Sequence, residues 1–315
     1  MPHPIILDVD PGHDDALAIL LAARHLDVLG ITTVAGNQTL EKVTVNALKV
    51  LELAGLTHIP VAKGMVRPLI SELLHSPVIH GETGLEGADL PAPTTPLEPR
   101  HATEFIVETV RAHPGITLVP TGPLSNVGMA LRRAPDIAGH IREISLMGGS
   151  TDGGNVTAAA EFNIYCDPEA AHIVFTSGIP IKMSGLNITR QAPATAERRE
   201  RIRNLGNRTG KVAAAWLDFY GAQVKKTLNV DGPSLHDAVA VAWLIDPTLI
   251  KSKKMHVAVE LKGNLTRGMT VCDHRWPGYG GTGVRRRLPP NVEVGQELDV
   301  ERFFALLYDT LVTYP

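Results

Sequence analysis

The amino-acid sequence predicts an α/β fold, with an open, mostly parallel twisted sheet and helices on both faces in a Rossmann-like arrangement. Short β-branched runs alternate with longer helical segments, which is typical of βαβ units. The chain has 315 residues, 44% of them hydrophobic, which is enough to bury a sizeable core. We find no internal repeat and no convincing linker, so we expect a single domain over residues 1–315.

Each expected element has a local reason. Residues 5–7, Ile-Ile-Leu, are the kind of β-branched run that forms a buried strand, and an apolar helix follows over residues 13–24. Residues 28–34 predict the second strand and residues 40–53 the second helix. The strand pattern then returns, with helices between, at residues 59–62, 116–119, 144–147 and 179–183.

Two later stretches break this alternation. Residues 75–99 are rich in glycine and proline and predict a long loop, which is either an active-site flap or plain surface. Residues 195–228 predict consecutive helices, and we interpret their charge-rich start as a solvated face. Towards the C-terminus we expect strands at residues 255–261 and 269–272 and a helix near residues 299–311.

Composition and charge exclude several classes of protein. The 30 basic and 33 acidic residues are mixed along the chain and give no electrostatic footprint for nucleic acid. The longest apolar run, residues 238–245, is far shorter than the roughly 20 residues of a membrane span. The N-terminus lacks the basic region of a signal peptide, and two widely separated cysteines suit a reducing compartment. We therefore expect a cytoplasmic protein without a nucleic-acid or membrane partner.

Residues 278–283 match the G-x-G-x-x-G pattern of dinucleotide-binding loops. Such a loop needs a strand before it and a helix N-terminus after it, to meet the pyrophosphate. Here Arg-Arg-Arg-Leu-Pro-Pro follows from residue 285, which is a poor helix start. We therefore do not expect a dinucleotide site.

The strongest functional signal is an acidic cluster where the first strand meets the first helix. Asp8, Asp10, Asp14 and Asp15 lie within eight residues. Asp14 and Asp15 alone are explained by a favourable helix dipole, but like charges this close repel unless a cation neutralises them. Oxygen ligands from a short loop indicate Ca²⁺ or Mg²⁺, although Ile19 at the twelfth position excludes an EF-hand.

Two further groups of polar residues are placed at the ends of predicted elements, one after a strand and one at the start of a helix. The segment 148–155, continued by Glu161 and Asn163, offers amides and carboxylates that suit sugar hydroxyls, although ordinary turn chemistry explains the same residues. His236 and Asp237 open an apolar helix. Taken alone, that pair is better explained as a packed ring and a first-turn acid.

Taken together, these segments resemble the inosine–uridine nucleoside hydrolase family along essentially the whole chain. Asp8-Val-Asp-Pro-Gly-His-Asp-Asp-Ala is similar to the N-terminal signature of that family. The later blocks, in the same order, are Val34-Ala-Gly-Asn37, Pro120-Thr-Gly-Pro-Leu-Ser-Asn126, Met147-Gly-Gly, Asn155 with Glu161-Phe-Asn163, and Leu235-His-Asp237. The resemblance implies hydrolysis of the N-glycosidic bond of ribonucleosides to ribose and free base, in nucleoside catabolism and salvage, by a homodimer or homotetramer.

The resemblance also implies roles for particular residues. One Ca²⁺ would be held by Asp10, Asp15, the main-chain carbonyl of Thr121 and Asp237. Asp10 would be the general base for the attacking water and His236 the acid that protonates the departing base. Substrate contacts would come from Asp14, Asn37 and Asn163 at the ribose hydroxyls, Asn155 and Glu161 at the 5′-hydroxyl, and Met147 and Phe162 nearby.

The base pocket and two rival functions remain open at this point. We expect His80 and Tyr220 to contact the nucleobase, with Trp276 as a stacking ring or simply a packed one. An acid-dependent phosphatase is the first alternative, because an Asp-x-Asp also begins that nucleophile motif, but it needs a hydroxyl residue where Gly12 stands. A non-catalytic nucleoside or ribose sensor is the second, and the presence of Asp10 and His236 argues against it.

Overall fold

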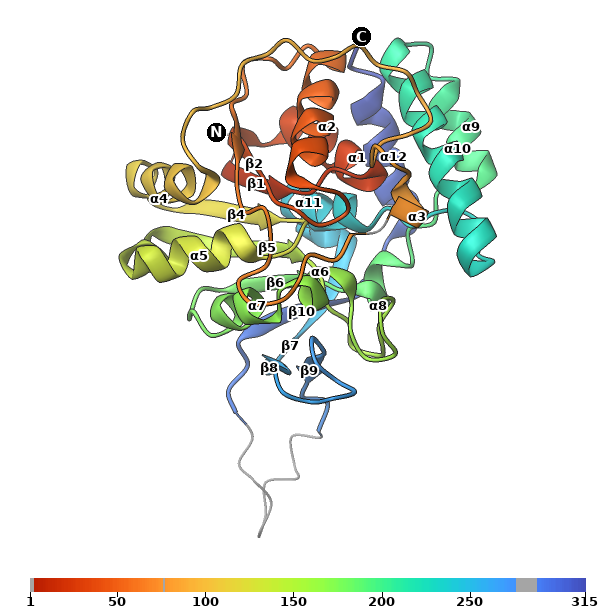
Figure 1. The fold of residues 1–315 in the computed structure, drawn as a ribbon. Helices are drawn as coiled ribbons and strands as arrows, with labels where there is room; N and C mark the ends of the chain where they lie inside the picture. The colour runs from red at the N-terminus through yellow and green to blue at the C-terminus, as the bar shows by residue number, and fades with distance from the viewer. Residues whose placement is uncertain (1–2, 76, 276–287) are drawn as a thin grey trace.

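The computed structural model describes residues 3–75, 77–275 and 288–315. Its centre is an eight-stranded sheet in the order β3-β2-β1-β4-β5-β6-β10-β7 (Figure 1). Neighbouring strands are parallel except β7, which runs antiparallel to β10 at the edge. The strand bounds are β1 Pro4–Val9, β2 Asp27–Thr33, β3 Val61–Lys63, β4 Ile116–Pro120, β5 Ile141–Met147, β6 Ile181–Ser184, β7 Ile250–Met255 and β10 Val292–Leu298.

Helices cover both faces of this sheet, as the sequence predicts (Figure 1). Their bounds are α1 His13–His25, α2 Leu40–Leu53, α3 Pro77–His80, α4 Ala102–Ala112, α5 Ser125–Arg133, α6 Phe162–Cys166, α7 Pro168–Phe175, α8 Leu186–Thr189, α9 Ala196–Arg203, α10 Arg208–Leu228, α11 His236–Ile245 and α12 Val300–Leu311, with 3₁₀ turns at Pro135–His140 and Pro247–Leu249. The helix over residues 40–53 has the predicted bounds.

The core lies in two layers, one on each side of the sheet. Successive side chains of a strand point to opposite faces, so Ile5 and Leu7 pack into one hydrophobic cluster and Ile6 into the other. The first cluster receives α1, α2, α10, α11 and α12, and the second receives α4, α5 and α7. This double burial explains why the strands read as continuous apolar runs rather than alternating ones.

The C-terminal third differs from the expectation. The strand expected over residues 255–261 is confirmed only as the shorter β8 Val257–Val259, because Met255 ends β7 instead. Strand β8 pairs with β9 Thr270–Cys272, which lies within the expected strand 269–272, in a separate two-stranded sheet. Strand β10 and the start of β7 are present in the structure but were not expected from the sequence. In β7, the exposed Lys251, Lys253 and Lys254 obscure the apolar pattern by which a buried strand is recognised. Charged lysines of this kind are typical of a strand at the edge of a sheet.

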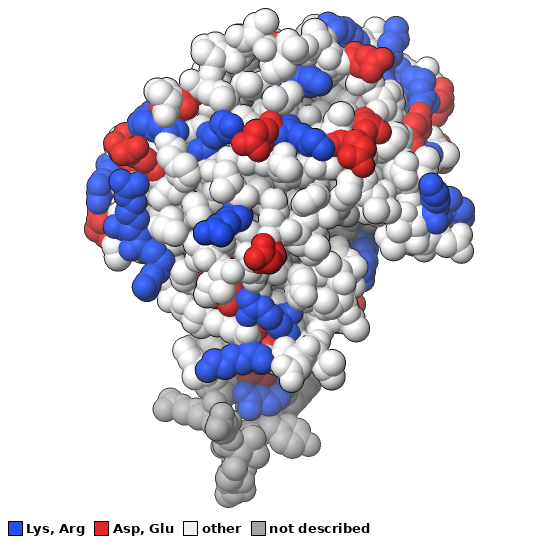
Figure 2. All heavy atoms as spheres, in the orientation of Figure 1, with Lys and Arg blue, Asp and Glu red and all other residues white. Residues whose placement is uncertain are grey.

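The charge-rich start of the 195–228 helices is more than a solvated face. The guanidinium carbon of Arg198 lies 4.1 Å from the ring centroid of Phe304, and that of Arg201 lies 4.1 Å from the Tyr308 ring. These contacts dock α9 onto α12, so the expectation holds only for the outward side chains of this run. On the face drawn in Figure 2, basic and acidic side chains are interspersed.

Two other singled-out stretches are a loop and a segment outside the described residues. The described residues of the stretch 75–99, namely 75 and 77–99, form the expected loop apart from the short helix α3. Trp276 and the G-x-G-x-x-G pattern at residues 278–283 lie outside the described residues. No helix in the described part of the chain combines the length and hydropathy that crossing a membrane requires.

Candidate active site

The polar residues singled out in the sequence gather at the carboxyl ends of the central parallel strands. Asp10 follows β1, Asn37 follows β2, Thr121 follows β4, and Met147 ends β5. Parallel strands present these ends along one edge of the sheet, and the helices that follow begin there. The topology therefore brings together residues that are far apart in the chain.

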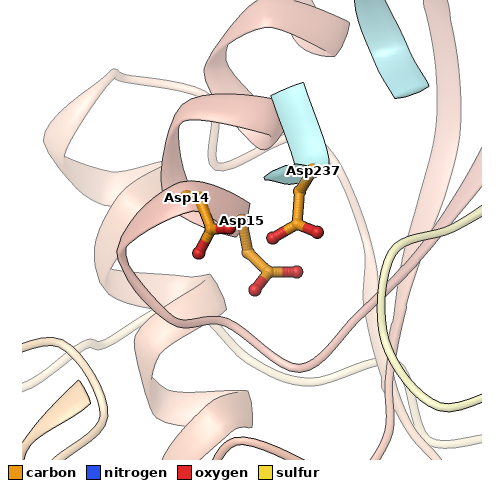
Figure 3. A group of neighbouring side chains, drawn as sticks. All are labelled: Asp14, Asp15 and Asp237. Carbon is orange, nitrogen blue, oxygen red and sulfur yellow. The ribbon is translucent and has the colours of Figure 1, made fainter. Parts of the chain in front are cut away.

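Three carboxylates form the centre of this site. Asp14 and Asp15 start α1, Asp237 starts α11, and these two helices pack on each other (Figure 3). One oxygen from each residue lies within 4.8 Å of the others, and all three residues are buried. Burial and the neighbouring Asp15 raise the pKa of Asp14 to about 7, and burial with Asp14 raises that of Asp237 well above its usual range. A divalent cation would relieve this crowding of oxygen donors.

Asp10 approaches the same centre from the end of β1. Its Oδ2 accepts a hydrogen bond from the Asn37 backbone N–H (2.7 Å), and its carbonyl accepts one from Asn37 Nδ2 (3.1 Å). Two glycines leave room for the carboxylate, since a Cβ at Gly36 or Gly122 would lie 2.2 or 2.7 Å from its oxygens. Burial and the charge of Asp15 raise the pKa of Asp10 well above its usual range. Asn37 Nδ2 also lies 3.4 Å from Asp15 Oδ2, which links the two acids.

Thr121 and Asn163 complete the inner polar network. The hydroxyl of Thr121 donates to Asp15 Oδ1 (2.8 Å), while its carbonyl accepts from Asn163 Nδ2 (2.6 Å). Asn163 Nδ2 also donates to the carbonyl of Met147 (3.1 Å). Since a carbonyl has two lone pairs, that of Thr121 keeps one for a further partner. The structure thus places Asp10, Asp15 and Thr121 in one bonded network beside Asp237 and Asp14.

Glu161 has a local structural role that its sequence did not predict. It caps α6, and its oxygens accept from the backbone N–H groups of Asn163 (2.9 Å), Gly149 (2.9 Å) and Ile164 (3.1 Å). Burial raises its pKa to about 7. Asn155 is exposed, and its Oδ1 accepts from the backbone of Phe162 (2.9 Å). The expected 5′-hydroxyl contacts of Asn155 and Glu161 stay predictions.

A cluster of rings lies beside the carboxylates. His80 is buried within 5.0 Å (ring centroids) of Tyr220, and both contact His13 of α1. His236 is partly buried, and its Nδ1 lies 2.7 Å from the hydroxyl of Thr189. Burial lowers the pKa of His236 to about 4 and, with the charge of His13, lowers that of His80 well below its usual range.

Two residues of this region make contacts that the sequence did not predict. His13 stands inside the acidic segment, and this position is the one sequence signal that points to it. Asp8 lies below the site, and its Oδ1 accepts from Thr32 (2.6 Å) and Asn126 (2.7 Å). Its Oδ2 is buried without a hydrogen-bond partner among the described residues. Nothing in the local sequence indicates these long-range partners.

A parallel α/β sheet with buried acids at its strand ends defines an α/β enzyme whose site suits a divalent cation and a polar substrate. Comparisons with known proteins agree. Residues 5–305 match the family model for inosine-uridine preferring nucleoside hydrolase. An inosine-uridine preferring nucleoside hydrolase of Leishmania major is 43% identical over 316 residues, covering 99% of this chain and 98% of its own.

Two further relatives extend the comparison. A pyrimidine-specific ribonucleoside hydrolase, RihA, of Photobacterium profundum is 47% identical over 318 residues and is covered completely, as is this chain. The solved structure of a plant nucleoside hydrolase superposes with a TM-score of 0.91 at 34% identity, over 99% of both chains. The chain therefore belongs to the inosine-uridine preferring nucleoside hydrolase family, and it is a ribonucleoside hydrolase.

Proposed function

We propose that this enzyme cleaves the N-glycosidic bond of ribonucleosides, with purine bases, pyrimidine bases or both, using one Ca²⁺ held in the carboxylate cluster. The observation that carries the proposal is the buried convergence of Asp14, Asp15 and Asp237 within 4.8 Å. Buried like charges are costly without a cation, and carboxylate and carbonyl oxygens are the donors that calcium prefers. The donor set therefore fits the metal that the family resemblance implies.

The residues that would hold the cation are Asp10, Asp15, Asp237 and the carbonyl of Thr121. When bound, Ca²⁺ supplies polarisation of a water and of the ribose hydroxyls. The hydrogen bond from Thr121 to Asp15 and the bond from Asn163 to the Thr121 carbonyl support this set, because they hold both ligands in place. Asp14, which the structure groups with Asp15, would contact both the ribose and this centre.

Carboxylates and amides activate the attacking water and position the ribose. Asp10 accepts the proton of the attacking water, and the hydrogen bond from the Asn37 backbone to its Oδ2 orients the carboxylate, while Gly36 and Gly122 leave room for it. Asp14, Asn37 and Asn163 position the ribose hydroxyls. As the glycosidic bond breaks, positive charge develops on the sugar, and the surrounding carboxylates stabilise it. Asn155 and Glu161 contact the 5′-hydroxyl, with Met147 and Phe162 beside the substrate.

The leaving base is protonated on the opposite side of the reacting carbon. His236 donates a proton from Nε2, since its Nδ1 is engaged by Thr189. The ring is neutral in the free enzyme. It takes up a proton from solvent as the departing base becomes negative, because that charge raises the pKa of the imidazole, and it passes this proton to the base. His80 and Tyr220 line the base pocket and contribute to base preference.

We also propose that residues 1–315 act as one domain, because one eight-stranded sheet connects the chain from residue 4 to residue 298. The free state of Cys166 and Cys272 supports a reducing, cytoplasmic location. A homodimer or homotetramer is the assembly that the family resemblance favours, and sedimentation of the purified chain tests it.

A nucleoside panel tests the proposal. Inosine, uridine, adenosine and cytidine are incubated with enzyme, and reducing-sugar release is followed after chelation and after re-addition of Ca²⁺, Mg²⁺ or Zn²⁺. We expect ribose release that calcium restores. Asp237→Asn should abolish calcium retention and activity together, while Asp89→Asn, at an exposed position, should change neither. Full activity after exhaustive chelation refutes the metal role, and phosphate release from a phosphate ester without ribose release supports a phosphatase instead.

A further inference from the structure

His13 lies between Gly12 and Asp14 at the start of α1, and the proposed function gives it no role. Its ring is completely buried. Its Nδ1 lies 3.1 Å from Nδ1 of His80, and its Nε2 lies 2.8 Å from the carbonyl oxygen of Glu86. Both nitrogens of this ring are therefore engaged, and neither of them contacts a carboxylate.

The two imidazoles meet edge to edge. Their planes differ by 18°, and their centroids are 5.3 Å apart although the two Nδ1 atoms are only 3.1 Å apart. Rings stacked face to face do not give this combination, whereas rings side by side in nearly one plane do. Because the N–H and the lone pair of an imidazole lie in its plane, the contact is an in-plane N–H···N hydrogen bond.

The direction of this hydrogen bond follows from the partners of His13. The Glu86 carbonyl can only accept, so Nε2 of His13 carries a hydrogen. Two Nδ1 atoms 3.1 Å apart cannot both carry one. A doubly protonated His13 would be a buried cation without a bonded anion, which is costly. Hence Nδ1 of His13 accepts and Nδ1 of His80 donates.

That direction determines what His80 offers. With its hydrogen on Nδ1, a neutral His80 keeps a lone pair on Nε2. No group in residues 3–75, 77–275 or 288–315 makes a hydrogen bond to this Nε2. The side chain thus has one nitrogen committed to the fold and one available as an acceptor.

The hydrogen bond between His13 and the Glu86 carbonyl also holds the loop that follows His80. Its carbonyl oxygens at Gly81, Thr83 and Glu86 accept hydrogen bonds from side chains of the neighbouring helices and turns. The donors are Gln38 (3.0 Å), Asn46 (2.9 Å) and His13 (2.8 Å), respectively. His13 therefore connects this loop to the helix that carries Asp14 and Asp15.

We propose that His13 is a positioning residue, which holds His80 in the tautomer with hydrogen on Nδ1 so that Nε2 accepts a hydrogen bond from an N–H group of the nucleobase. The inference rests on the proposed function, which places His80 in the base pocket. An acceptor at Nε2 of His80 favours substrates whose base has a ring N–H on its pairing edge, such as inosine and uridine.

The tautomer is measurable without turnover. Long-range ¹H–¹⁵N correlation NMR on the full chain, labelled with ¹⁵N-histidine and assigned with His80→Gln, should show the hydrogen of His80 on Nδ1. His13→Gln, whose amide supplies one acceptor and one donor, should retain it. His13→Leu should shift His80 towards the Nε2–H form. Hydrogen on Nε2 in the wild type, or an unchanged His80 signal in His13→Leu, overturns the proposal; the wild-type spectrum decides even if the leucine variant fails to fold.

Kinetics supply the second readout. For uridine, His13→Leu should lower kcat/KM roughly tenfold, the effect of one hydrogen bond, mainly through KM, while His13→Gln recovers most of the loss. His25→Leu, at the exposed far end of α1, is the matched control and should change neither tautomer nor kinetics. Equal calcium content in all variants excludes a disturbed metal site. A wild type that hydrolyses no nucleoside would overturn the proposed function and leave the NMR result standing.

Discussion

Asp8 offers a quantitative prediction about stability. It lies in the middle of the sheet, 1% exposed, and among the described residues only Thr32 and Asn126 donate to it. Burial raises its pKa from 3.8 to about 7. The unfolded chain loses this proton near pH 3.8 and the folded chain only near pH 7, so the folded state binds one proton more in between. The contribution of Asp8 to stability is fully present below pH 3.8 and is lost as pH rises to about 7.

The magnitude follows from the size of this shift. Each pKa unit corresponds to about 1.4 kcal/mol, so between pH 5 and pH 8 the folded state loses about 3 kcal/mol from Asp8 alone. Asp8→Asn removes the titration and keeps an oxygen for Thr32 and Asn126. The free energies of unfolding of wild type and variant should therefore diverge by about 3 kcal/mol over that interval, in favour of the variant at high pH.

Urea unfolding at pH 5, 6, 7 and 8, in the presence of chelator, measures this difference. The other buried acids titrate in both proteins, so the comparison isolates Asp8 together with its charge interactions with Asp10 and Asp15. Any pH-independent cost of burying the new amide shifts one curve uniformly. With an m value near 3 kcal/mol per molar, the midpoints should separate by about 1 M between pH 5 and pH 8. The exposed Asp89→Asn is the control and should run parallel to the wild type. Parallel curves for Asp8→Asn would refute the reasoning.

Three further predictions concern the chemistry. His236→Ala should lower kcat on inosine or uridine by roughly 10²–10⁴-fold. A riboside with a nitrophenolate leaving group needs no proton and should keep most of its rate. Equal losses on both kinds of substrate would indicate that His236 has only a packing role. The ribose contacts of Asp14, Asn37 and Asn163 should make uridine better than 2′-deoxyuridine by factors of roughly 10⁴–10⁵ in kcat/KM, because a missing hydroxyl leaves buried polar groups unpaired. Comparable values would contradict those contacts. Elemental analysis of protein purified without chelator should find about one equivalent of calcium per chain, and stoichiometric zinc would contradict the oxygen-donor site.

Much of the architecture was predictable because its signals are local. The runs at residues 5–7, 116–119 and 144–147 are apolar because parallel strands are buried on both faces, and the structure confirms each of them as part of a strand. Strand β10 was not predictable in this way. Its Val-Glu-Val-Gly-Gln-Glu-Leu segment mixes polar and apolar residues, and it becomes a strand by pairing with β6 and β7.

The site likewise combines features that the local sequence predicts with features that depend on the fold. The cluster of Asp8, Asp10, Asp14 and Asp15 is visible in the sequence because four acids in eight residues need a charge to balance them. Which of them lies nearest to Asp237 depends on how α1 packs against α11, and that packing is set by the whole core.

The sequence by itself therefore determined the fold class, the acidic centre and the family, since alternating runs and a compact motif depend on neighbours in the chain. Only the tertiary structure decided that Asp8 is a buried acid beneath the site and that Glu161 caps a helix. It also decided that His13 joins His80 to the Glu86 carbonyl. Such contacts join residues up to 118 positions apart, as between Asn126 and Asp8, and depend on atoms that only the folded chain brings within hydrogen-bonding distance.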